Sequence, residues 1–247
     1  NLDAWRRMHR GTNSLIGSMV AIGSAEGTMR LFADMLAALP AGESVPDACT
    51  RALRPIEAAD VDRCAEMAGE FASSRSAIDF AVAPIDDPRR LPPSRIAGRV
   101  LFDKLQWTAW LAEQDARYCE EPPNTLLADS PHAAFERGPL QRLECISSVS
   151  GCIVADIAAP EYVQYDVRTL DFAAHLRLAA ALLWLRDTAG AQPVAQRFEQ
   201  RPAALRSGRR ASGYDASSGT LFVDNLWKAR EPRFALAIGA ARAVASK

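Results

Sequence analysis

The stretch that decides the fold runs from Tyr162 to Thr188 and reads YVQYDVRTLDFAAHLRLAAALLWLRDT. Between Leu176 and Leu185 its residues are apolar on almost every side, with Arg177 as the exception. A helix that is hydrophobic all round is buried inside a fold, because a surface helix keeps one polar face. The stretch therefore predicts a central helix that begins at Pro160-Glu161 and is surrounded by other helices.

Helical patterns continue upstream of this central stretch. Apolar residues recur every three or four positions from Leu15 to Leu39, which predicts a long helix with one buried stripe. Further helices are expected over residues 2–10, 44–54, 61–81 and 96–119, and partly over 140–158, with proline-rich surface connections over 83–94 and 120–139. In the helix over 61–81 we expect an inner face of Val61, Cys64, Ala65, Ala68, Phe71 and Ala72 and an outer face of Asp62, Arg63, Glu66 and Glu70.

The pattern changes after Gly190, where the helical periodicity ends. The turn-like run Tyr214–Gly219 precedes Thr220–Val223, which has the composition of a strand, so a small β-hairpin is expected there. The sequence thus predicts a mainly α fold: an irregular multi-helix bundle around a central helix in the C-terminal half, with a short hairpin near the C-terminus. We expect one domain over 1–247, with a helical body over 1–188 and a C-terminal extension over 189–247.

The charge balance argues against a nucleic-acid partner. Lys and Arg total 29 against 30 for Asp and Glu, whereas nucleic-acid binders usually carry a basic excess. The arginine-rich loop with Arg201, Arg206, Arg209 and Arg210 is predicted to be solvated. No apolar run reaches the roughly 20 residues that a membrane span needs. Because the chain starts with Asn1 rather than Met, we expect a processed or truncated form from which an N-terminal signal or membrane anchor has been removed.

Five cysteines are present, and no two have the C-x-x-C spacing of zinc ribbons or thioredoxin-like sites. Cys145 and Cys152 are seven residues apart across a Ser- and Gly-containing interval, so they could close a small disulfide loop. Cys49 and Cys64 on consecutive predicted helices form a second possible pair. The alternative is five free thiols that pack as small apolar residues. A disulfide would indicate an oxidising compartment.

Two pairs of polar residues could carry chemistry. Glu66 and Glu70 are one helical turn apart, a spacing that suits metal binding or acid–base work, although a solvated helix face is the simpler interpretation. Asp171 and His175 have the same spacing, and a carboxylate can orient an imidazole, but no G-x-S-x-G nucleophile motif is present. Without a Walker A sequence, a G-x-G-x-x-G loop or a Cys/His cluster, we expect no catalytic residues, no cofactor and no metal.

Trp107 and Trp110 are three residues apart and share one face of a predicted helix. Aromatic side chains dominate protein interfaces, so the pair could anchor a partner or line a pocket. Packing in the core is the alternative. We name Trp107, Trp110, Glu66 and Glu70 as the candidate binding residues.

One segment resembles a known pattern. Residues 150–162, SGCIVADIAAPEY, with Tyr165, Arg168, Asp171 and Arg177-Leu178 after them, resemble uncharacterised proteobacterial envelope proteins. In those proteins a Gly-containing helix leads through a Pro-x-Tyr-x-x-Tyr step into a long Ala/Leu-rich helix, and Leu15–Leu39 is similar to their first soluble helix. The resemblance covers about two-thirds of the chain. The C-terminal part departs from it, because the Gly-x-Tyr-Pro step and the Pro-x-Asp-Pro turn of those proteins are absent here.

The resemblance implies a periplasmic domain tethered to the inner membrane by an N-terminal segment outside this chain. Together with the lack of a catalytic constellation, it leads us to expect a non-catalytic binding protein with a protein partner, such as an inhibitor or immunity protein for a secreted antibacterial toxin. The alternatives are a hydrolase with an unrecognised active site, and a carrier of a lipid or other small ligand with an apolar cavity beside Trp107, Trp110 and Trp184.

Overall fold

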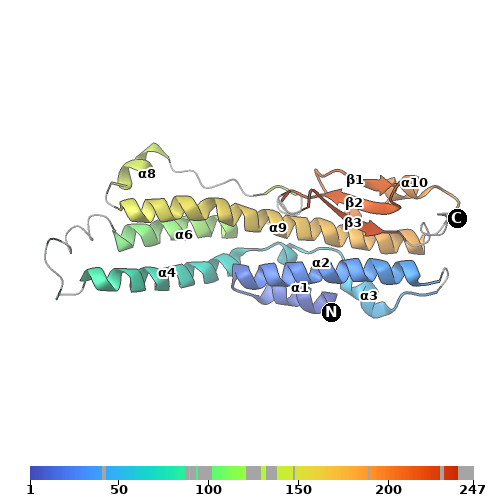
Figure 1. The fold of residues 1–247 in the computed structure, drawn as a ribbon, viewed down its shortest axis with the longest axis horizontal. Coiled ribbons are helices and arrows are strands. Elements are labelled where there is room, and N and C mark those ends of the chain that lie inside the picture. The colour runs from blue at the N-terminus through green and yellow to red at the C-terminus, as the bar shows by residue number, and fades with distance from the viewer. Residues whose placement is uncertain are drawn as a thin grey trace.

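Helix α9 (Val149–Asp187) runs along most of the elongated molecule in Figure 1, a computed structural model. Its 39 residues span about 58 Å at 1.5 Å per residue. The structure describes residues 1–40, 43–86, 89, 93, 102–120, 129–131, 138–146, 148–188, 190–228 and 231–238. The predicted fold class is confirmed: the chain is mainly helical, with a long helix in its C-terminal half and a small antiparallel sheet near the C-terminus.

The predicted start of the central helix at Pro160 is wrong. Helix α9 begins at Val149 and continues through Pro160, so the expected mixed region over 140–158 holds the short helix α8 (Pro139–Glu144) and the first turns of α9. Proline favours a first helical turn, but it is tolerated inside a helix when packing holds both sides. Here α6 (Lys104–Glu120) packs along α9. The same correction applies to α4 (Cys64–Asp86), which continues through Pro84 into the expected connection.

Helices α1 (Leu2–Gly11) and α2 (Leu15–Ala38) form a hairpin, as the sequence predicts. Arg6 on α1 is fully buried and donates to the backbone carbonyls of Ala52 and Arg54 at 3.0 Å. It also pairs with Asp60 at 2.7 Å, so α1 is fixed against α3 (Asp47–Ala52) and the 3₁₀ turn η1 (Ala58–Asp60). Burial alone would raise the pKa of Asp60, but hydrogen bonds from Arg10 and Arg6 hold it at about 2.

A three-stranded antiparallel sheet packs on α9 beyond the connecting α10 (Val194–Glu199) and η2 (Ala203–Leu205). Its strands are β1 (Ser212–Asp215), β2 (Thr220–Asp224) and β3 (Arg233–Ala237), so the predicted hairpin gains a third strand. Alternate side chains of β2 and β3 are buried, as expected for a sheet with one covered face. Leu221, Val223, Phe234 and Leu236 share one apolar core with residues of α2 and α9.

Two disulfides lie in the part of the molecule formed by α4, α6, α8 and the beginning of α9. The predicted Cys145–Cys152 bridge is present and connects the segment after α8 to the first turn of α9. The predicted Cys49–Cys64 pair is wrong, because Cys64 at the start of α4 bonds Cys119 near the end of α6, and Cys49 is a free thiol. Two disulfides indicate an oxidising, extracytoplasmic location. None of the helices in the described ranges combines the length and apolarity needed to cross a bilayer.

Removing the two disulfides should have unequal effects. Cross-linking restricts the unfolded chain more when the closed loop is longer. The separation is 55 residues for Cys64–Cys119 and 7 for Cys145–Cys152. We expect the paired Cys→Ser variants to lose about 4 and about 2 kcal/mol in free energy of unfolding. Urea denaturation would measure both, with Cys49→Ser as the control that changes little. Equal losses would contradict the chain-entropy explanation.

Candidate functional site

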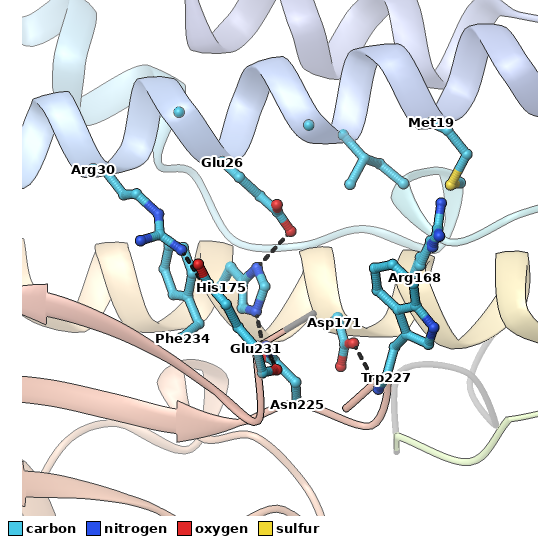
Figure 2. A pocket seen from close by; sticks show the side chains of 13 residues that line it. Met19, Glu26, Arg30, Arg168, Asp171, His175, Asn225, Trp227, Glu231 and Phe234 are labelled. Carbon is cyan, nitrogen blue, oxygen red and sulfur yellow. Dashed lines mark hydrogen bonds and ion pairs between the residues drawn. The ribbon is translucent and has the colours of Figure 1, made fainter. Parts of the chain in front are cut away.

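A cleft of about 360 Å³ opens between α2, α9 and the connection from β2 to β3. Figure 2 shows its side chains converging from these three segments, with Glu26 and Arg30 on α2 facing Arg168, Asp171 and His175 on α9. Its volume lies at the lower end of the range of small-molecule sites. The described lining consists of Met19, Ile22, Gly23, Glu26, Gly27, Arg30, Arg168, Asp171, His175, Asn225, Trp227, Glu231 and Phe234.

His175 connects the three segments at the centre of the cleft. Its Nδ1 lies 2.9 Å from Glu26 Oε1, and its Nε2 lies 2.8 Å from Asn225 Oδ1. The Asn225 amide nitrogen donates to the carbonyl of Glu231 at 2.9 Å, which directs the amide oxygen towards the imidazole. Both ring nitrogens therefore lie within hydrogen-bond distance of an oxygen on another segment. The ring also stacks on Phe234, with centroids 3.9 Å apart.

Asp171 fixes the connection between β2 and β3 against α9. Its carboxylate accepts hydrogen bonds from the backbone N–H groups of Leu226 at 2.8 Å and Trp227 at 3.0 Å, and it pairs with Arg210. Asp171 is 4% exposed and Arg210 is 9% exposed. Ionic hydrogen bonds of this kind are stronger than neutral ones and keep a buried carboxylate satisfied. The backbone that carries Trp227 into the cleft is therefore held in one position.

Two arginines lie at opposite ends of the cleft. Arg30 pairs with Glu231 at 2.6 Å, and both side chains are partly exposed. The guanidinium of Arg168 lies 3.7 Å from the ring centroid of Trp227, a stacked cation–π geometry, and the pair is visible beside Met19 in Figure 2. The cleft thus combines aromatic faces, paired charges and one stacked guanidinium.

The contacts of His175 argue against one catalytic role, that of a general base. Both nitrogens of His175 are engaged by fixed partners, so the imidazole has no free nitrogen with which to take a proton from a substrate. The lining residues given above include no serine, threonine, cysteine or lysine that could act as a nucleophile. In the part of the chain that the structure describes, no group of three or more His, Cys, Asp or Glu is placed to hold a metal.

Glu66 and Glu70 lie outside this cleft and do not converge on one site. The predicted solvated face is wrong for Arg63 and Glu66, which are 0% and 2% exposed and pair with each other at 2.8 Å. Burial raises the pKa of Glu66. Glu70 accepts a hydrogen bond from the backbone N–H of Leu15 at 3.0 Å, so it caps the first turn of α2 from another helix. The buried and exposed faces of this helix are thus the reverse of those predicted. Charged side chains can be buried when they pair, whereas the alanines expected inside have little apolar area to bury.

Trp107 and Trp110 also lie away from the cleft. Trp110 is 4% exposed, and Trp107 is half-buried against Phe102, with ring centroids 4.7 Å apart. Their environment is that of core packing, and a binding role for the pair stays a prediction. Asp171 and His175 do line one site, although each has its own partners rather than the other as its partner.

Sequence reasoning missed Arg168, Asn225 and Trp227 as site residues, and it placed Arg210 in a solvated loop. That placement is wrong, because Arg210 is buried against Asp171, and it is also wrong for Arg201, which is buried and donates to the carbonyl of Phe198. Asn225 and Trp227 follow a strand and show no periodic pattern, so they gave no signal of their own. The spacing of Arg168, Asp171 and His175 at successive turns of one helix was the available clue.

None of the protein-family models, curated proteins or solved structures compared with the chain is significantly similar to it. The resemblance to proteobacterial envelope proteins therefore stays a prediction. The candidate site is supported by its geometry alone.

Asp115 on α6, 5% exposed, should make stability fall as pH rises. Neither of its carboxylate oxygens has a hydrogen-bond partner within the described ranges. Burial, helped by the charge of Glu70, raises its pKa from 3.8 to about 7. The folded state therefore binds this proton more tightly than the unfolded state, and the stability that it contributes is lost as pH rises from about 4 through 7.

Asp115→Asn removes this titration, so the free energy of unfolding should rise by a few kcal/mol at pH values above about 7 and change little near pH 4. Denaturation at several pH values would measure the difference between variant and parent. The exposed Asp34→Asn is the control. If the difference in free energy of unfolding does not grow with pH, the raised pKa of Asp115 is wrong.

Proposed function

We propose that this protein is a non-catalytic, extracytoplasmic binding protein and that its ligand site is the cleft between α2, α9 and the β2–β3 connection. The polar side chains in the cleft are fixed before any ligand arrives, because Glu26, His175 and Asn225 hold one another and Asp171 holds the backbone at Trp227. A preformed site loses less conformational entropy on binding.

The observation that carries the proposal is the pair of glycines in the cleft wall. Gly23 and Gly27 occupy successive turns inside α2, where each glycine costs about 1 kcal/mol relative to alanine. A Cβ atom at either position would meet no other segment of the described chain within 4 Å, so packing among the described residues does not require glycine there. Both residues line the cleft, and side chains at these positions would reduce its room. Open space maintained against helix stability is what a ligand site needs.

The finer expectations stand as parts of this proposal. A periplasmic domain tethered by an N-terminal segment is consistent with the two disulfides, and it is proposed rather than established. A protein partner, for example a secreted toxin that this protein inhibits, is supported by exposed apolar side chains on α2: Ile16, Val20, Leu31 and Met35. A lipid carrier is less well supported, because charged side chains make up much of the cleft lining.

Gly27→Leu should separate stability from binding. The added side chain would fill the cleft without a clash at its Cβ, and the variant helix should gain about 1 kcal/mol. A screen of small charged and neutral organic molecules, read by thermal shift and by NMR shifts of the Asn225 side-chain amide, would find ligands of the parent protein. We expect Gly27→Leu to melt higher and to bind none of them.

Gly11→Leu is the matched control, because Gly11 is also an exposed helical glycine with open space at its Cβ and lies outside the cleft. It should bind as the parent does. A parent protein that binds no compound, or a Gly27→Leu variant that binds all of them unchanged, would overturn the proposed site.

A further inference from the structure

Arg168 differs from the other charged groups of the cleft. Its guanidinium stacks on Trp227 and lies 6.0 Å from the ring centroid of Tyr165. Its Nε is buried and has no hydrogen-bond partner, and within the described ranges the side chain forms no ion pair. A buried N–H group without an acceptor is unfavourable, so contacts within the described protein do not fully satisfy this guanidinium.

The remaining charges of the cleft compensate one another. Arg30 pairs with Glu231, the His175 ring with Glu26, and Asp171 with Arg210. Among the described residues, no carboxylate pairs with the guanidinium of Arg168. A ligand that brings one negative charge would complete the balance.

We propose that the cleft binds a small monocarboxylate, with its carboxylate on the exposed edge of Arg168. This inference rests on the proposed binding function and names the class of ligand. Planar carboxylates match the fork of N–H donors on a guanidinium, and stacking on Trp227 fixes the plane of that fork in advance. The apolar part of the ligand would lie along Met19, Ile22 and the glycine wall.

The neighbours of Arg168 set the charge of the ligand at one. Asp171 lies on the same face of α9 as Arg168, three residues further along. Glu26 faces α9 from α2. These carboxylates repel anions, and a dianion such as a phosphate monoester would carry a second charge with no cation to meet it. A neutral amide of the same shape would leave Arg168 uncompensated.

The test compares ligands that differ only in charge. Hexanoate and phenylacetate are the monocarboxylates, hexanamide and phenylacetamide their neutral counterparts, and phenylphosphonate the dianion at pH 8. Isothermal calorimetry on the intact protein should show the acids binding about 10- to 100-fold more tightly than the amides, with weakening at higher salt.

Peptides with a free or an amidated C-terminus distinguish the two sources of a carboxylate. Binding of the free-acid peptides but not of the amidated ones would indicate the C-terminus of a partner protein, and binding of the small acids alone would indicate a free metabolite.

Arg168→Gln should abolish the preference for the acids, and Arg168→Lys should keep only part of it, because an ammonium has no planar fork. The exposed Arg209→Gln is the matched control and should keep the preference. Circular dichroism would verify that each variant is folded. Equal binding of acids and amides, preferred binding of the phosphonate, or an unchanged preference in Arg168→Gln would overturn the carboxylate proposal while the binding function stands. If neither these ligands nor any compound of the screen binds, both the carboxylate proposal and the proposed binding function are overturned.

Discussion

The structure depends on how the ionisable side chains in the buried part of α9 are compensated. A buried charge without a partner is so unfavourable that each of these groups requires a complementary group from another segment. The partners are Arg63 for Asp166, Arg210 for Asp171, Glu26 and Asn225 for His175, and Asp129 for Arg177. These partners come from α2, the residue that precedes α4, the sheet region and the segment at Asp129. The charges of one helix therefore specify where its neighbours lie, which apolar packing alone does with less precision.

This constraint explains which parts of the fold the sequence could reveal. The central helix and α2 were predictable, because runs of apolar residues at helical spacing lie within single segments. The start of α9 and the end of α4 were not, since proline was given more weight than packing. The buried face of α4 was missed because Arg63 and Glu66 satisfy each other, a fact that no single-residue property records. Most of the cleft was missed for the same reason, because its residues contact partners from segments that are far apart in the sequence.

In the cleft, too, charged side chains are paired with partners from other segments. Arg168 is the exception among the described residues. Its pairs immobilise the lining, and the indole of Trp227 supports a guanidinium that has no counter-ion in the described chain. The two glycines of α2 keep the space in front of it open. An incomplete polar network inside a well-packed domain is unfavourable unless something completes it. The ligand proposed above would complete this network.

The positions of the disulfides have a consequence for how the molecule is held together. Both lie in the half formed by α4, α6 and the beginning of α9, away from the sheet in Figure 1. The other half, which contains the cleft, is held by an apolar core and by ion pairs. A reductant therefore acts directly on the part of the molecule formed by α4, α6 and the beginning of α9, whereas ionic strength acts on the ion pairs around the cleft. The disulfides and the lining of the proposed site share no residue.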